Sequence, residues 1–128
     1  MLGYLYCGIL LPKENWSELI PDIEIFKLDS PWDLKDAKID APKMKKITLR
    51  QFVRRIRNSL GHGNVIFHVP EKITDRNQKW AETTLEFSDI NPRDSSDTFH
   101  AIISLDSLLK MVKQIHGIVY TNVKERLK

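Results

Sequence analysis

The chain has 128 residues, 41% of them hydrophobic, which is typical of one globular domain with an ordinary core. Its single cysteine, Cys7, excludes an intramolecular disulfide framework and a cysteine-based zinc site. The formal net charge is only +3, but residues 41–70 contain seven basic residues and no acidic one, whereas the remainder carries 13 basic and 17 acidic residues. Such a basic block is either a candidate surface for nucleic acid or another anion, or a solvated helix face.

The N-terminal segment, residues 1–11, is apolar without alternation, and we expect it to form a buried helix. It is too short to span a bilayer, which needs about 20 residues, and it lacks the features of a signal peptide. The sequence therefore predicts a soluble, cytoplasmic protein that does not associate with membranes. Residues 12–40 contain three prolines and eight acidic residues, and we expect mostly connecting chain that packs on the body of the domain.

The clearest predicted element is a helix over residues 47–62. Thr48 and Gln51 have the spacing of a capping box, and Gly61 and Gly63 mark its end. Strands are predicted at residues 65–69, 83–87 and 98–103, with a turn at 91–94 and a polar, mobile loop at 71–80, which suggests a small antiparallel meander. A final helix is expected after Ser104. The apolar face of the predicted 47–62 helix consists of Leu49, Phe52, Val53, Ile56 and Leu60.

Near the end of the predicted 47–62 helix, an arginine, an amide and a histidine follow one another. Asn58 and His62 are four residues apart and share a face with Arg54, and Arg57 flanks that face. Histidine can take and give a proton near neutral pH, and arginine matches the geometry of a phosphate. These residue types fit metal-free cleavage of RNA through its 2′-OH. Alternatively, His62 only caps the helix, where the helix dipole favours it.

The segment Arg57-Asn58-Ser59-Leu60-Gly61-His62 resembles the R-N-x-x-x-H signature of the HEPN superfamily. The resemblance extends from about residue 2 to residue 114. It includes the upstream Leu-Leu-Pro-Lys-Glu-Asn-Trp segment at residues 10–16 and the strand that leads into the last helix, and it is strongest to a plasmid- and phage-associated subfamily. The resemblance implies a single domain over residues 1–128. Its expected fold is mainly α (α+β), a HEPN-like helical bundle with a small antiparallel hairpin or meander inserted before the last helix. Since related proteins have one more helix before residues 10–16, we expect the first helix to be shortened or missing.

The resemblance also implies a function, a metal-independent endoribonuclease of the toxin or defence type that works as a homodimer with a composite active site. Arg57 would bind the scissile phosphate, His62 would be the general acid or base, and Asn58 would support their geometry, with no metal or other cofactor. RNA is the expected partner, and an antitoxin protein is a further one. The alternatives are a HEPN module that binds RNA or regulates without cutting, and a purely structural domain. Flanking RNA contacts are expected from Arg50, Arg54 and Arg55, with pairing to acidic residues of the 14–40 stretch as the alternative for Arg54 and Arg55.

Other residues of chemical interest have simpler interpretations. No histidine outside the motif has metal-ligand spacing with acidic residues, so we expect sheet or surface roles for them. The tryptophans could stack on RNA bases, but packing of Trp16 and Trp32 and an exposed loop position for Trp80 are the expected roles. Lysines 43, 45 and 46 are expected to form a solvated rim. The histidines outside the motif are His68, His100 and His116.

Overall fold

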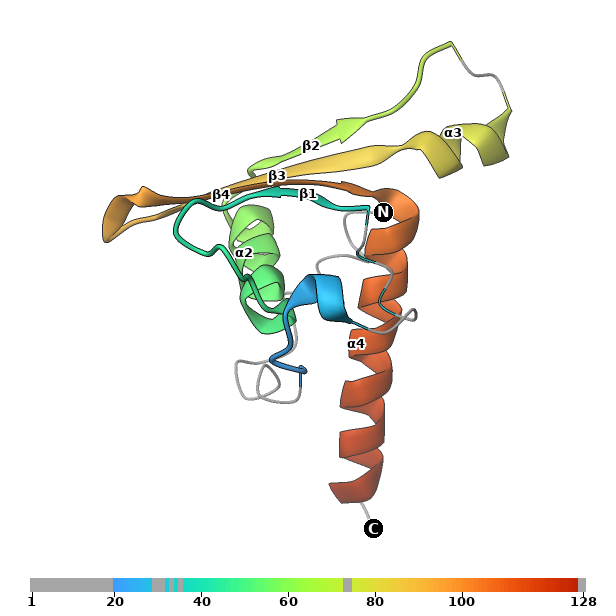
Figure 1. Ribbon diagram of the computed structural model, residues 1–128. Helices are drawn as coiled ribbons and strands as arrows, with labels where there is room; N and C mark the ends of the chain where they lie inside the picture. Colours follow the sequence, from blue (N-terminus) through green and yellow to red (C-terminus); the bar gives the residue numbers. More distant parts are fainter. Residues whose placement is uncertain (1–19, 29–31, 33, 35, 73–74, 127–128) are drawn as a thin grey trace.

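A computed structural model of the chain describes residues 20–28, 32, 34, 36–72 and 75–126. Within these residues, helices pack on one face of a four-stranded antiparallel sheet in the order β1-β4-β3-β2 (Figure 1). Along the chain the elements are the 3-10 helix η3 (Ile25–Lys27), β1 (Lys38–Asp40), α2 (Leu49–Gly61), β2 (Val65–His68), α3 (Arg76–Glu82), β3 (Thr84–Asn91), β4 (Asp94–Ser104) and α4 (Leu105–Arg126).

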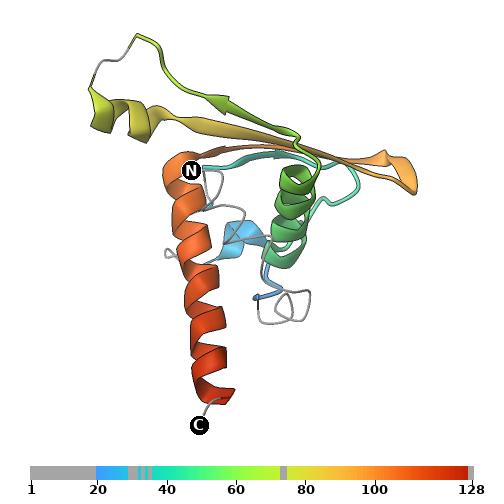
Figure 2. The same cartoon turned by 180° about the vertical axis from the view of Figure 1, so that it is seen from behind.

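The fold is therefore mixed α+β, and the expectation of a mainly helical bundle with a small inserted meander was wrong. The sheet is a full layer of the domain, because β3 and β4 alternate buried and more exposed residues along their length. Helices α2 and α4 both cover the same face of this sheet (Figure 2). The apolar residues on the inner face of β3 and β4 are Leu85, Phe87, Phe99, Ala101 and Ile103.

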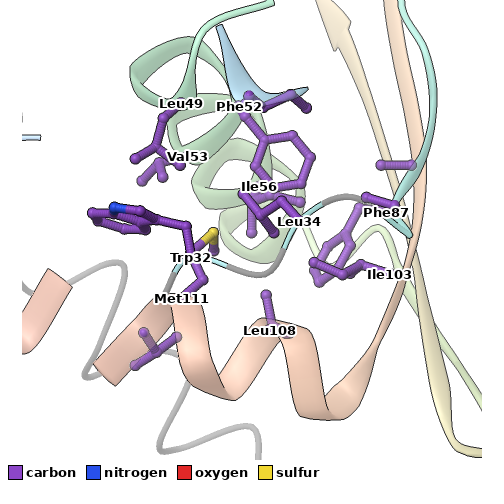
Figure 3. Packing of buried hydrophobic residues seen from close by; sticks show 14 of the residues in the cluster. Trp32, Leu34, Leu49, Phe52, Val53, Ile56, Phe87, Ile103, Leu108 and Met111 are labelled. Atoms are coloured by element: carbon purple, nitrogen blue, oxygen red, sulfur yellow. The ribbon is translucent and has the colours of Figure 1, made fainter. Parts of the chain in front are cut away.

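Helix α2 follows its sequence pattern closely. The Thr48 Oγ1 accepts a hydrogen bond from the backbone N–H of Gln51 (3.3 Å), and the Gln51 Oε1 accepts one from the N–H of Thr48 (3.0 Å), which confirms the capping box. At the other end, Gly63 has a φ of 72°, the left-handed conformation expected of the residue after a helix. All five residues of the predicted apolar face are buried. Figure 3 shows four of them, Leu49, Phe52, Val53 and Ile56, in the core between α2, α4 and the sheet.

The predicted antiparallel meander is present, but its strands are longer than expected. Strands lie at the three predicted places and pair antiparallel, but β3 and β4 both reach the tight turn at residues 92–93. Residues 76–80, expected to be loop, lie in α3, whose N-cap Asp75 accepts from the backbone N–H of Asn77. Strand β1 was not predicted, because three residues are too few to show a period. The predicted helix over residues 1–11 lies outside the described residues.

The core lies between α2, α4 and the inner face of the sheet (Figure 3). Phe52 of α2 meets Phe99 of β4 edge to face, with ring centroids 5.8 Å apart. Trp32 is buried in this core, as expected. Trp80 is exposed, as expected, but it lies in helix α3 and not in a loop. Helix α4 begins after Ser104, whose Oγ accepts from the N–H of Ser107, so the predicted start of the last helix is confirmed. The core thus holds α2 rigidly on the sheet, with its C-terminal end beside β3.

Candidate functional site

The predicted motif lies at the C-terminal end of α2, where the chain turns into β2. Several backbone hydrogen bonds hold this turn, among them one from the N–H of Asn64 to the carbonyl of Ser59 (2.8 Å) and one from the N–H of Ser88 to the carbonyl of Asn64 (3.2 Å). His62 is the C-cap residue and its side chain is 65% exposed. The imidazole is therefore accessible to a substrate on a backbone that is fixed on both sides.

A buried carboxylate that the sequence did not single out lies next to the motif. Asp89 of β3 is 3% exposed. Its Oδ2 accepts hydrogen bonds from Arg55 Nη1 (2.9 Å) and from Asn58 Nδ2 (3.4 Å), and its Oδ1 lies 4.0 Å from Nδ1 of His62. Residues 55, 58 and 62 thus form the helix face that meets Asp89, with Arg55 in the place expected for Arg54. The signal that could have found Asp89 is its alternation with Leu85 and Phe87, which points all three to the core.

Arg55 has a structural role. It is 8% exposed, and its guanidinium forms ion pairs with Asp89 (2.9 Å) and Asp97 (2.5 Å). Burial alone would lower the pKa of Arg55, but the two carboxylates together raise it, so the group stays charged. A hydrogen bond from Asn91 and the charge of Arg55 hold the pKa of Asp97 below its ordinary value. We therefore correct the expected RNA contact of Arg55, because its donors already face two carboxylates in the interior.

The other arginines of the basic block differ in whether their guanidinium has a partner within the described residues. Arg50 donates through Nε and Nη2 to the carbonyl of Ile20 (3.2 and 2.9 Å) and lies 3.8 Å from Asp22, so it ties an N-terminal segment to α2. Arg54 is exposed and Arg57 is half-buried. In the part of the chain that the structure describes, neither the guanidinium of Arg54 nor that of Arg57 has a hydrogen bond or an ion pair. These two arginines are the cations of α2 that remain available to an anionic ligand.

One of the three lysines expected in a solvated rim has a definite partner. Lys43 forms an exposed ion pair with Asp94, the first residue of β4. The hydrogen bond from Lys43, followed by those from Ser96, lowers the pKa of Asp94 to about 2. Both Lys43 and Lys45 are exposed, but within the described residues only Lys43 of these two has an ion-pair partner.

Replacing Lys43 by methionine is expected to raise the pKa of Asp94 from about 2 toward its ordinary value of 3.8. Because the pKa of Asp94 is depressed in the fold, its contribution to stability is present above the unfolded pKa and is lost as the pH falls toward 2. Carboxyl NMR of Asp94 across a pH titration measures the shift. Lys45→Met is the matched control and should leave the titration of Asp94 unchanged; an equal effect of both variants would contradict the assigned ion pair.

Two of the remaining histidines lie on the outer face of the sheet, as expected. His68 of β2 and His100 of β4 place Nε2 at 3.0 Å and 2.6 Å from the two carboxylate oxygens of Glu86 on β3. These hydrogen bonds lower the pKa of Glu86. Within the described residues, no three histidine, cysteine or acidic side chains are grouped so that they could hold a metal ion. The outer-face cluster is separate from the end of α2, because residues 86 and 89 point to opposite faces of β3.

Comparison with known proteins adds one clear finding. The model of a protein family described as HEPN pEK499 p136 matches residues 1–126, almost the whole chain. No curated protein and no solved structure gives a significant match. Among the helices of the described residues, none combines the length and apolar character needed to cross a membrane.

Proposed function

The chain belongs to the HEPN family pEK499 p136, and from this premise we propose that it is a metal-independent endoribonuclease of the toxin or defence type. The observation that carries the proposal is the complete Arg57-Asn58-x-x-x-His62 motif at the accessible end of a capped, rigid helix. Family membership by itself covers both RNA-cleaving and non-catalytic domains. The state of the two reactive side chains favours cleavage, since Arg57 is without a partner in the described structure and His62 is exposed.

The proposed reaction needs one proton acceptor and one fixed cation. His62 takes the proton of a ribose 2′-OH, whose oxygen then attacks the adjacent phosphorus. Arg57 neutralises the charge that builds on the phosphate oxygens. The 5′-oxygen leaves with the proton that the His62 imidazole has taken up, and the products are a 2′,3′-cyclic phosphate and a 5′-hydroxyl end. Asn58 supports the site by linking the motif to the buried Asp89.

The positions of Arg57 and His62 favour a site shared by two chains. Five residues along an α-helix correspond to a rotation of about 140°. Arg57 and His62 of one chain therefore leave α2 in different directions, and both can reach a single phosphate more readily when a second copy supplies one of them. We propose a homodimer in which Arg57 of one chain and His62 of the other act on the same phosphate.

The proposal is tested by incubating the purified chain with single-stranded RNA in EDTA and identifying the product ends. Cleavage with 2′,3′-cyclic phosphate ends is expected. Arg57→Ala should lose about 100-fold or more in rate, because the transition-state charge loses its cation. Arg54→Ala, the matched control on the same helix, should weaken RNA binding only a few-fold and reduce its salt dependence. Cleavage that requires a divalent metal, or that is equal in Arg57→Ala and the wild type, would contradict the proposal.

The shared site is tested by mixing two inactive variants. A dimer of one Arg57→Ala chain and one His62→Ala chain contains one complete pair of Arg57 and His62 across the interface. We expect the mixture to regain cleavage that neither variant has alone, measured after unfolding and refolding them together. No regained activity, with mixed dimers shown by native mass spectrometry, would mean that each site uses residues of a single chain.

A HEPN module that binds RNA without cutting it is the second candidate. It is favoured by the guanidinium of Arg54, which has no partner among the described residues, suits a phosphate contact and lies outside the motif. Its signature is RNA binding that Arg54→Glu abolishes and His62→Ala leaves intact, together with the absence of cleavage by the wild type.

A further inference from the structure

We infer that Asp89 is a positioning residue that holds the imidazole of His62 with Nδ1 protonated and Nε2 directed toward the substrate. The inference rests on the proposed function for its effect on cleavage, whereas the tautomer of His62 can be measured without RNA. It adds a residue from β3 to a site whose sequence motif lies on the last turns of α2 and its C-cap.

The surroundings of Asp89 leave one of its oxygens for His62. Oδ2 accepts hydrogen bonds from both Arg55 and Asn58, so this oxygen is occupied. Oδ1 lies 4.0 Å from Nδ1 of His62. At this distance the imidazole is just outside hydrogen-bond length, and such contacts often shorten when the substrate binds.

The buried carboxylate is itself held firmly. Its backbone belongs to β3, which is paired with β4 at this point, where Asp89 lies opposite Phe99. Arg55 compensates its charge from the interior side. A carboxylate held in this way favours the tautomer of a neutral histidine that carries its proton on the facing nitrogen, because only a donor can pair with it. The other nitrogen, Nε2, is then free to accept the proton of a 2′-OH.

Substitution of Asp89 by asparagine should reverse this preference. Since Arg55 and Asn58 both offer donors to the Oδ2 position, the amide oxygen of Asn will take that position. The amide NH2 then replaces Oδ1 and points to Nδ1 of His62. An NH2 group pairs with an unprotonated Nδ1, so the proton moves to Nε2, and the nitrogen that should act as base is blocked.

The test compares Asp89→Asn with Asp97→Asn in the full-length chain. Both variants remove one carboxylate from Arg55, but only Asp89 lies beside His62. 15N NMR of the imidazoles should show mainly Nδ1–H for neutral His62 in the wild type and in Asp97→Asn, and mainly Nε2–H in Asp89→Asn. The kcat for RNA cleavage should fall about 10- to 100-fold in Asp89→Asn with little change in KM, and by less than about threefold in Asp97→Asn.

Three outcomes overturn the inference. They are a wild-type His62 that is mainly Nε2–H, a tautomer that Asp89→Asn leaves unchanged, and equal losses of kcat in the two variants. The first of these is measured on the wild type alone, so the test holds even if Asp89→Asn does not fold. A wild type that does not cleave RNA would contradict the proposed function, and the NMR result would still decide the role of Asp89.

Discussion

Replacing His62 by alanine is expected to reduce RNA cleavage by about 100- to 10,000-fold, the range by which a general acid–base group accelerates proton transfer. The fold should be almost unaffected, because the side chain is 65% exposed and lies just beyond the last residue of α2. We expect the free energy of unfolding to change by less than about 0.5 kcal/mol. Single-turnover cleavage in EDTA and urea unfolding measure the two quantities.

The same variant separates the proposed enzyme from a purely structural motif. If His62 only caps α2, alanine would lower the stability and any loss of activity would follow from unfolding. Lost cleavage at unchanged stability therefore supports catalysis by His62. Unchanged cleavage in His62→Ala would contradict the enzyme assignment. A wild type that does not cleave RNA, with RNA affinity retained in His62→Ala, would point to the binding module.

Replacing Arg55 by alanine is expected to lower the free energy of unfolding by about 3–5 kcal/mol. The substitution leaves Asp89, which is 3% exposed, without its buried counter-ion, and it also opens space beside the core. A loss of this size is a large part of the total stability of an ordinary domain, about 5–15 kcal/mol. Chemical denaturation monitored by tryptophan fluorescence measures it.

Arg54→Ala is the matched control for this prediction. Arg54 is the neighbouring arginine on α2 but is exposed and without a partner in the described part of the chain, so its loss should cost less than about 0.5 kcal/mol. Equal stability of Arg54→Ala and Arg55→Ala would show that the buried ion pairs make no net contribution to the free energy of unfolding.

The pH dependence of stability gives a second check. Because Arg55 helps to depress the pKa of Asp97, the ion-paired stability is present above an unfolded pKa of about 3.9 and is lost at lower pH. The difference between the wild type and Arg55→Ala should therefore shrink in acid.

The local features of the motif helix could be predicted because they depend on residues close together in the chain. The capping box of Thr48 and Gln51, the left-handed Gly63 and the buried face of α2 all follow from short-range spacing. The family resemblance is centred on the same segment, and the family model, which matches residues 1–126, confirms it. Helix α3 was missed although Asp75 is a good N-cap, because the polar composition of residues 71–80 was taken to indicate a loop.

The class of the fold could not be predicted in the same way. Three strands were expected, but the expected helical bundle assigned the core to helices, whereas β3 and β4 form a complete wall of it. Strand β1 exists through its pairing with β4, where Ile39 lies opposite Ala101, and three residues carry too little pattern to reveal it. Pairing between residues far apart in the chain is a tertiary property, and it decided how much of the domain is sheet.

The basic block of residues 41–70 shows the same division. Seven cations in an acid-free segment, and the HEPN spacing of Arg57 and His62, can be read from the sequence alone. Which of these cations have a partner within the described residues depends on the tertiary fold, because the partners lie elsewhere in the chain. Arg55 forms ion pairs with Asp89 and Asp97. Arg50 donates a hydrogen bond to the carbonyl of Ile20, and Lys43 forms an ion pair with Asp94. Whether a charge faces solvent or a buried carboxylate depends on which segments the fold brings together. The sequence of α2 contains no feature that indicates a partner on β3.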